Sequence, residues 1–152
     1  MKKLLYTALE PLTVPRPVER VKWISKRCAG KYVLDLGCFD ETALVKGGTE
    51  QWLHGMIAQE AKQVLGIDSS EKLPAEGLIT GPRSKIERGN VMALAKESIS
   101  IIDIDLIVAG ELIEHLQDTT AFLRQLKTLF PGRELIISTP NATSLANTIL
   151  AL

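Results

Sequence analysis

The sequence predicts a single α/β domain in which a doubly wound, mostly parallel sheet is covered by helices on both faces. Two observations support this prediction. Four short apolar runs, rich in Val, Ile and Leu, and a weaker strand-like segment over 84–88 alternate along the chain with segments of helical periodicity. The four runs are apolar at most positions instead of at alternate positions, which is typical of parallel strands buried on both faces.

The predicted strands end where turns and polar residues begin. We place the strands at residues 31–36, 63–68, 84–88, 101–109 and 134–138. Because parallel strands are joined by right-handed crossovers, such a sheet binds its ligand outside the carboxyl ends of the strands. Residues that carry function should therefore follow each strand directly.

Helical segments fill the connections between these strands. We predict helices at about 18–29, 49–62, 92–97, 119–130 and 143–152, after an extended lead-in over residues 1–17. Thr49 is the predicted N-cap of the second helix, and either Asp118 or Thr119 caps the fourth. The residues of the fourth helix expected to face inward are Phe122, Leu123, Leu126 and Leu129. The whole chain, residues 1–152, fits one domain.

Composition argues against several classes of function. The 152 residues include 18 basic and 18 acidic side chains, so the net charge points to neither nucleic acid nor an anionic membrane. No apolar run approaches the roughly 18 residues of a membrane span, and Glu10 and Pro11 interrupt a start that resembles a signal peptide. Two cysteines, Cys28 and Cys38, suit neither a disulfide framework nor a zinc site, so we expect a cytoplasmic protein.

Charge is nevertheless uneven along the chain. The first 31 residues contain two acidic residues, Glu10 and Glu19, and eight basic ones: Lys2, Lys3, Arg16, Arg20, Lys22, Lys26, Arg27 and Lys31. Such a segment either meets an acidic partner or a phosphate, or forms a solvated helix face. We favour the solvated face.

Glycines and polar residues follow every predicted strand. The five segments are Asp35 to Phe39, Asp68 to Ser70, Gly89 to Val91, Gly110 to His115, and Thr139 to Asn141. A glycine lets the backbone approach a ligand closely, and a carboxylate such as that of Asp68 can accept both hydroxyls of a ribose. Each segment alone also has a structural explanation as a turn or a helix cap. Their order at successive strand ends is what indicates a ligand site.

The segments "VLDLGC", "GIDSS", "GNVMAL", "AGELIEHL" and "LIISTPNA" follow one another in the order of the motif series of class I S-adenosylmethionine-dependent methyltransferases. Over about residues 18–150 the chain resembles this family. Within the family it is similar to ubiquinone-biosynthesis O-methyltransferases and to methyltransferases of sugar and polysaccharide pathways, the second group also through "WLH…AKQVLGIDSS". The resemblance implies a Rossmann-like sheet with the strand order 3-2-1-4-5.

The same resemblance implies S-adenosylmethionine as cofactor, S-adenosylhomocysteine as its product, and a small-molecule acceptor with O-methylation favoured. The residues that would line the cofactor are Asp35, Gly37, Cys38 and Phe39 at the methionine portion, Asp68 and Ser69 at the ribose, Asn90 and Val91 at the adenine, and Gly110 beneath the sulfonium.

Glu111, Glu114 and His115 stand at i, i+3 and i+4 after the fourth strand, so one helical turn would place them on one face. Leu112 and Leu116 would then point to the core. Three roles remain open for the polar trio: rim residues without chemistry, a general base at His115, or a divalent-metal site, which the E-x-x-E-H pattern of the ubiquinone-pathway enzymes suggests. We rank them in that order and predict no metal.

Two departures from the family pattern stand out. Phe39 and Glu41 occupy the second and third positions of the usual G-x-G-x-G turn, so Phe39 either packs on the cofactor or crowds its tail. The resembling enzymes also continue with two more strands, which this chain lacks. We favour a fragment of a longer protein over completion by another chain, and expect a homodimer through the exposed edge of the fifth strand.

Three functions compete on this sequence. Methyl transfer from S-adenosylmethionine to a small molecule leads. A non-catalytic or incomplete cofactor-binding domain, which needs a C-terminal region or a partner for activity, is the alternative. A dinucleotide-dependent dehydrogenase ranks last, because its G-x-G-x-x-G fingerprint fails at Phe39 and Thr42.

Overall fold

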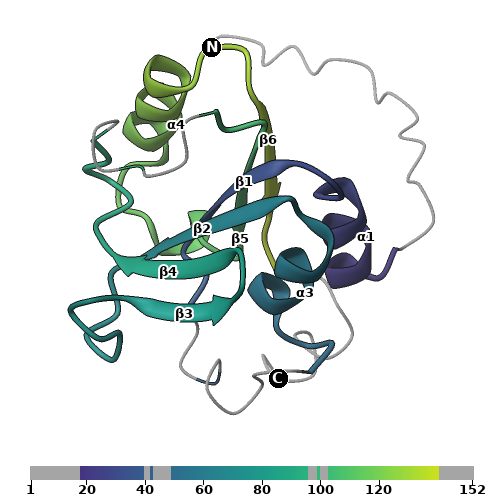
Figure 1. Cartoon of the computed structure of the whole chain (residues 1–152). Coiled ribbons are helices and arrows are strands. Elements are labelled where there is room, and N and C mark those ends of the chain that lie inside the picture. The colour runs from purple at the N-terminus through teal and green to yellow at the C-terminus, as the bar shows by residue number, and fades with distance from the viewer. Residues whose placement is uncertain (1–17, 40–41, 43–48, 96–98, 100–102, 141–152) are drawn as a thin grey trace, which may run out of the picture.

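The computed structural model describes residues 18–39, 42, 49–95, 99 and 103–140 (Figure 1). The strands are β1 (Tyr32–Leu36), β2 (Gln63–Asp68), β3 (Leu78–Gly81), β4 (Ser84–Arg88), β5 (Leu106–Gly110) and β6 (Glu134–Ser138). The helices are α1 (Arg20–Arg27), α3 (Leu53–Glu60), the 3₁₀ turn η2 (Ile113–His115) and α4 (Thr119–Leu129). The predicted helix over 143–152 lies outside the described residues.

The strands form one sheet in the order β3-β4-β2-β1-β5-β6. The five predicted strands correspond to β1, β2, β4, β5 and β6, and all their pairings are parallel. Among themselves they take the predicted order 3-2-1-4-5. The predicted Rossmann-like α/β fold is therefore confirmed.

Strand β3 is the addition that the sequence did not predict. It pairs antiparallel with β4 through a tight connection at Pro82 and Arg83. The strand is four residues long and only partly buried, and the side chain of Ile79 is 82% exposed. A short strand with one exposed side lacks the continuous apolar run that identified the central strands.

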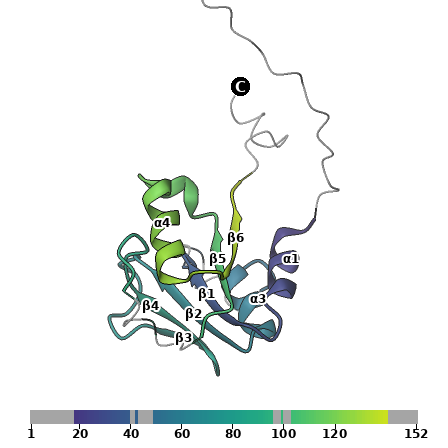
Figure 2. The ribbon, with the colours of Figure 1, turned by 90° about the horizontal axis from the view of Figure 1, so that it is seen from above.

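Helices cover both faces of the sheet, as predicted (Figure 2). On one face α4 buries Phe122 and Leu126 against Leu34, Leu65 and other strand residues. On the opposite face lie α1 and α3, whose buried residues include Ile24 and Ile57. The mostly apolar character of the central strands β1, β2 and β5 thus reflects burial on two sides.

Helix α4 shows how local sequence sets an element. Asp118 is its N-cap, and the carboxylate accepts a hydrogen bond of 2.8 Å from the amide of Ala121. Phe122 and Leu126 recur at helical spacing and are buried. The prediction that Leu123 faces inward is wrong. Its side chain is 39% exposed, because it lies one position beyond the buried stripe.

Three other predicted boundaries need correction. Helix α3 begins at Leu53 instead of Thr49, because Thr49 closes a turn in which its carbonyl accepts from the amide of Trp52 at 3.4 Å. Strand β5 begins at Leu106, five residues later than the predicted start at 101. Between β4 and β5, a turn at 91–92 and a bend at 93 are followed by irregular structure at 94–95, so the predicted helix over 92–97 is absent from its described part. Residues 96–97 lie outside the described residues.

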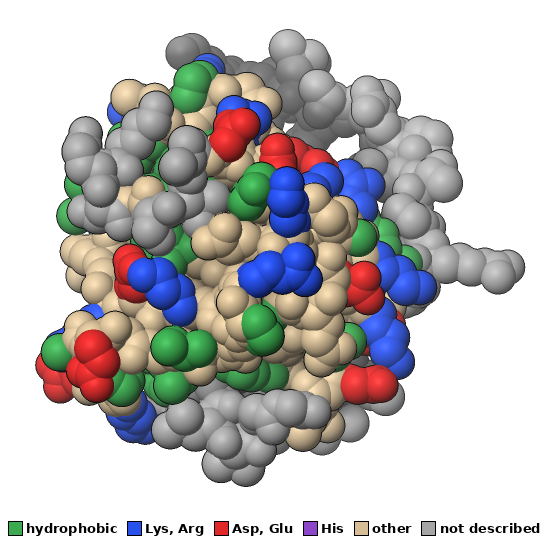
Figure 3. Space-filling view, in the orientation of Figure 1, with side chains coloured by type: hydrophobic (Ala, Val, Ile, Leu, Met, Phe, Trp, Pro, Cys, Tyr) green, Lys and Arg blue, Asp and Glu red, His purple; other side chains and the backbone are tan. Residues whose placement is uncertain are grey.

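Basic residues of the N-terminal part of the chain pair with acidic residues of other elements. The pairs are Arg20 with Glu111, Lys22 with Glu50, and both Arg27 and Lys31 with Glu134. Figure 3 shows basic and acidic side chains interspersed on the visible face. These basic side chains are thus ion-paired within the chain, and the solvated helix face that we favoured stays a prediction. No helix within the described ranges has the length and apolar character needed to cross a membrane.

Candidate functional site

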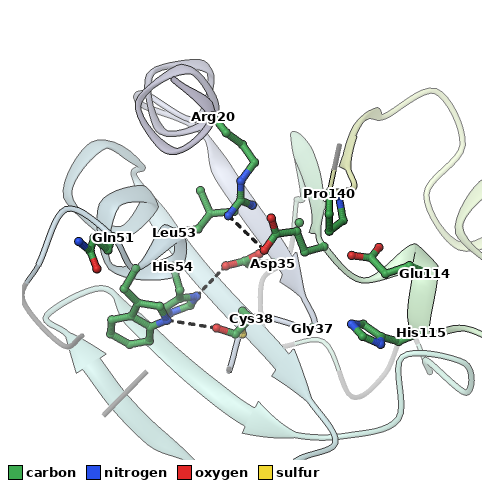
Figure 4. Close-up of a pocket in the computed structure, with 13 residues that line it drawn as sticks. Arg20, Asp35, Gly37, Cys38, Gln51, Leu53, His54, Glu114, His115 and Pro140 are labelled. Atoms are coloured by element: carbon green, nitrogen blue, oxygen red, sulfur yellow. Dashed lines mark hydrogen bonds and ion pairs between the residues drawn. The ribbon is translucent and has the colours of Figure 1, made fainter. Parts of the chain in front are cut away.

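Two cavities open at the carboxyl edge of the sheet. The larger, of about 280 Å³, lies where β1 and β5 end and α3 begins (Figure 4). The smaller, of about 160 Å³, lies beyond the ends of β2 and β4, where Ile67, Arg88 and Asn90 line it. In a parallel sheet these strand ends are where a ligand binds. The two cavities therefore mark the candidate site.

The turn after β1 borders the larger cavity and depends on Gly37. This residue has φ +67°, and a Cβ there would stand 2.7 Å from Cδ1 of Leu112. A side chain at this position would meet both backbone strain and a clash. Glycine is therefore required for the chain to turn this closely beneath the larger cavity.

Asp68 at the end of β2 ties this turn to the next strand. One carboxylate oxygen accepts from the amide of Phe39 at 2.9 Å, and the other from the amide of Ser70 at 2.8 Å. Each oxygen of a carboxylate has two lone pairs, so both keep capacity for a further donor. Asp68 is half-buried between the two cavities and lines neither.

The structure brings most of the predicted site residues to these cavities. Those that line the larger one are Asp35, Gly37, Cys38, Gly110 and His115. Asn90 lines the smaller one. Ser69 is exposed beside Asp68, and Val91 is buried in the core beneath α4.

Phe39 takes a different place from the one expected. Its side chain is 6% exposed and packs with Trp52, Leu73 and Ile86 in a separate apolar cluster. It lines neither cavity. What Phe39 contributes at the turn is its backbone amide, which donates to Asp68.

Several residues of the larger cavity were not singled out from the sequence. Arg20 reaches it from α1, and Trp52, Leu53 and His54 reach it from the start of α3. The indole Nε1 of Trp52 donates to the carbonyl of Cys38 at 3.2 Å, which joins α3 to the glycine turn. The "WLH" segment resembles methyltransferases of sugar and polysaccharide pathways, but nothing in its spacing marks a residue as part of a site.

Asp35 and His54 form a buried pair at the floor of the larger cavity. Nδ1 of His54 lies 2.9 Å from Oδ2 of Asp35, and the two residues are 0% and 1% exposed. On its other side, Nε2 of His54 lies 3.0 Å from both Oγ1 of Thr80 and Oγ of Ser84. Every polar atom of the imidazole therefore has a partner.

Glu111, Glu114 and His115 line the larger cavity on the side of β5 and η2. All three line it, as their spacing predicted, and Glu114 and His115 lie in the η2 turn. Leu112 is 8% exposed and Leu116 packs against the same apolar cluster, so both point to the core as expected. Glu111 adopts φ +54°, and its carboxylate forms an ion pair with Arg20 at 3.3 Å.

The cysteines sit in environments that disfavour the thiolate. Burial raises the pKa of Cys28 to about 12, and burial together with Asp35 raises the pKa of Cys38 well above its ordinary value. The Cys38 residue borders the cavity, but its sulfur faces Gly66 of β2.

Among the described residues, one group of three His, Cys, Asp or Glu side chains has its possible metal-ligand atoms within 4.8 Å of one another, and Cys38 belongs to it. Its other members are Asp35 and His54. Both ring nitrogens of His54 are engaged in hydrogen bonds, one of them with Asp35, so Asp35 and His54 form a hydrogen-bonded pair within this group.

The charges around the larger cavity suit a ligand that carries both signs. Arg20 offers a guanidinium from α1, and Asp35 offers a carboxylate from β1. An α-amino acid group, with its ammonium and carboxylate, would satisfy both. The smaller cavity, with Asn90 and the apolar Ile67 and Leu94, suits a flat base.

Comparison with known proteins identifies the family to which this architecture belongs. Residues 15–151 match the family described as "Methyltransferase domain". A probable S-adenosylmethionine-dependent methyltransferase of Mycolicibacterium smegmatis is 33% identical over 119 residues, which are 78% of this chain and 41% of that protein. A ubiquinone biosynthesis O-methyltransferase of Xanthomonas oryzae is 32% identical over 144 residues, covering 90% of this chain and 55% of that protein. The chain thus spans about two fifths to about half the length of these relatives.

Solved structures share the fold. A TehB-like SAM-dependent methyltransferase of Corynebacterium glutamicum superposes with a TM-score of 0.52 and 21% identity, over 77% of this chain and 59% of that one. A SAM-bound amino pentose methyltransferase of Micromonospora echinaspora gives a TM-score of 0.54 and 14% identity, over 80% of this chain and 50% of that one. At these identities the likeness concerns the fold alone.

Proposed function

This chain belongs to the family of class I S-adenosylmethionine-dependent methyltransferases, and we propose that it binds this cofactor across the two cavities and transfers its methyl group to a small-molecule acceptor. The observation that carries the proposal is the placement of Arg20 and Asp35 in one cavity and Asn90 in the other. Asp68 lies between them. That order matches the amino acid, ribose and base of the cofactor.

In the larger cavity, Arg20 would hold the carboxylate of the methionine portion and Asp35 its ammonium group. Gly37 keeps the backbone of the turn clear of side-chain bulk at this point. Asp68 would accept hydrogen bonds from the ribose hydroxyls, in addition to those it accepts from the amides of Phe39 and Ser70. Asn90 would contact the adenine with its side-chain amide.

The sulfonium of the bound cofactor supplies an electrophilic methyl group. The acceptor oxygen attacks the methyl carbon, the carbon–sulfur bond breaks with its electron pair going to sulfur, and the hydroxyl proton must leave. His115 is exposed at the wall of the larger cavity, so its imidazole is the group we assign to take that proton. The rest of the acceleration comes from holding the two reactants in line.

Hydroxyl methylation is favoured by the ubiquinone biosynthesis O-methyltransferases among the relatives, which share 32% identity with this chain. An exposed imidazole beside Glu111 and Glu114 suits an acceptor whose proton must be removed. A metal site at this trio would also activate a hydroxyl. We propose the metal-free role, and an assay with and without a chelator decides between the two.

The decisive experiment is calorimetric titration of the chain with S-adenosylhomocysteine and with NAD in parallel. We expect saturable binding of S-adenosylhomocysteine and none of NAD, because Phe39 and Thr42 replace two glycines of the dinucleotide fingerprint. Binding of NAD alone would overturn the proposal in favour of a dehydrogenase.

An incomplete cofactor-binding domain is the second candidate, and the lengths of the relatives favour it. The matched region is 41% of one relative and 55% of the other. If acceptor contacts lie in the unmatched part, this chain would bind S-adenosylhomocysteine yet transfer no methyl group. Assaying this chain beside any longer product of the same gene, with one acceptor panel, separates the two candidates.

We also propose a homodimer formed along β6. In the described part of the sheet β6 has β5 as its neighbour on one side, and Ile137 is 38% exposed. An edge strand with an apolar side chain favours pairing with a second strand. Light scattering should give twice the monomer mass, and Ile137→Lys should lower it, whereas a monomeric wild type would rule the dimer out.

For its location we propose the cytoplasm. Cys28 and Cys38 are both unpaired, and Cys28 is fully buried, which suits a reducing compartment. Since basic and acidic side chains pair across the surface of α1, we assign no nucleic-acid or membrane partner to this face. Fractionation of the cells that express the protein tests the location.

A further inference from the structure

A line of hydrogen-bonded polar groups, buried except for the half-buried Thr80, runs from the cofactor cavity into the sheet. It begins at Asp35 of β1, passes through the imidazole of His54, and ends at the hydroxyls of Thr80 and Ser84 (Figure 4 shows the first two). The two hydroxyls are themselves 2.6 Å apart. Four elements, β1, α3, β3 and β4, thus meet through side-chain hydrogen bonds.

The hydrogen-bonded line can cross β2 because the residue of β2 beneath His54 is Gly66, which has no side chain. Gly66 pairs with Asp35 on one side and with Ile86 on the other. A Cβ at Gly66 would lie 2.9 Å from Cε1 of His54 and 2.5 Å from Sγ of Cys38. The imidazole therefore lies over β2 in the space left by a glycine and spans from β1 to β4.

The hydrogen bonds fix which way each group points. A carboxylate only accepts, so Nδ1 of His54 is the donor to Asp35. In the neutral ring, Nε2 then accepts from the hydroxyl of Thr80 or Ser84, and that hydroxyl accepts in turn from the other. A buried imidazole held at both nitrogens has one orientation, and it holds one oxygen of the Asp35 carboxylate in place.

Asp35 also lines the larger cavity, where it is the acidic group of the floor. A buried carboxylate that must receive a ligand gains from being held in advance, because the ligand then does not lose free energy in ordering it. The line of hydrogen bonds supplies such support from the side away from the ligand.

We propose that His54, supported by Thr80 and Ser84, is a positioning residue that orients Asp35 for the ammonium group of the cofactor's methionine portion. This inference rests on the proposed function. It gives the unpredicted strand β3 a role, because β3 provides Thr80 and pairs with the strand that provides Ser84. The short hairpin is then part of the support of the cofactor site.

The test compares two ligands that differ in the amino acid portion, which includes the ammonium group. S-adenosylhomocysteine has the amino acid portion, and 5′-methylthioadenosine has the same thioadenosine without it. In His54→Ala, affinity for S-adenosylhomocysteine should fall about tenfold, the order of one hydrogen bond to a charged group, while affinity for 5′-methylthioadenosine should change less than about twofold. His54→Asn is the matched control, since its amide can donate from near the Nδ1 position, and it should recover most of the loss.

Equal weakening of both ligands in His54→Ala would show a purely structural role and overturn the inference, as would unchanged binding of both. Should His54→Ala fail to fold, Ser84→Ala with Thr80→Val gives the second measurement. Removing both hydroxyls should weaken S-adenosylhomocysteine about threefold and spare 5′-methylthioadenosine, and equal effects would again contradict the inference. A wild-type chain that binds neither ligand would instead refute the proposed function.

Discussion

Arg20 and Glu111 form an ion pair across the larger cavity, with Nη2 and Oε2 3.3 Å apart, although 91 positions separate them in the sequence. Arg20 comes from the first turn of α1, and Glu111 directly follows β5. Arg20 also donates to Oγ of Ser138 at 3.4 Å. The ends of β5 and β6 are thereby joined to α1 at the place where we expect the methionine portion of the cofactor.

The backbone at Glu111 predicts an unusual stability result. Its φ of +54° lies in the left-handed region, where a residue with a side chain is less stable than glycine by about 1 kcal/mol. Glu111→Gly and Glu111→Ala both lose the ion pair, so comparing them isolates the backbone. Urea unfolding should show Glu111→Gly more stable than Glu111→Ala by about 1 kcal/mol. Equal stability of the two variants would mean that the strain is absent in solution.

Asp68 should matter for binding through its free acceptor capacity. If it holds the ribose hydroxyls through two charge-assisted hydrogen bonds, Asp68→Ala should weaken S-adenosylhomocysteine by roughly 1.5–3 kcal/mol, measured by calorimetry. The variant also loses the acceptors for the amides of Phe39 and Ser70, so circular dichroism must confirm the fold. Asp68→Asn keeps one carbonyl acceptor and should give a smaller loss. Unchanged affinity in folded Asp68→Ala would remove Asp68 from the site.

His115 distinguishes the three roles of the polar trio. We expect His115→Ala, made in a chain with methyl transfer activity, to lower the rate constant kcat and to leave the affinity for S-adenosylhomocysteine nearly unchanged. The physical reason is that His115 is exposed on the wall of the cavity and is assigned to the acceptor proton.

Assays with and without a chelator complete that test. Retained activity in His115→Ala would indicate a rim residue without chemistry. A loss that the chelator does not affect supports the general base. Wild-type activity lost on chelation and restored by Mg²⁺ would replace the base with a metal site.

Glu134 predicts a pH-dependent contribution to stability. Hydrogen bonds from Arg27 and then Lys31 lower its pKa below the ordinary value of 4.5. Because the pKa of Glu134 is lower in the folded state than in the unfolded state, the carboxylate stabilises the fold, and this contribution is fully present above the unfolded pKa. The contribution is lost as the pH falls through the folded pKa.

The measurement compares wild type with Glu134→Gln by urea unfolding at several pH values. The stability difference should be largest near neutral pH and should vanish well below about pH 4, where both states carry a protonated group. Because the pair is exposed, added salt should also shrink the difference. A difference that does not vary with pH would show that the ion pairs contribute nothing.

Much of the fold could be predicted because local signals and burial agree. Apolar runs such as the one over 63–68 identified the central strands, and the cap at Asp118 located α4. The sequence missed β3, whose exposed Ile79 gives no burial pattern, and it misplaced the start of α3 because Thr49 caps a turn instead of a helix. Edge strands and helix starts depend on what packs beside them.

The sequence by itself determined the parallel α/β order and the positions of the candidate ligand residues, because in such a sheet every residue that follows a strand must reach the same edge. Only the tertiary structure decided the partners of those residues. Arg20, His54 and Thr80 come from three elements with no motif in common, and they join the site through long-range packing. The same packing buries the side chain of Phe39 in an apolar cluster, while its backbone amide donates a hydrogen bond to Asp68. Side-chain contacts between distant segments are set by how helices cover the sheet, and local sequence does not contain that information.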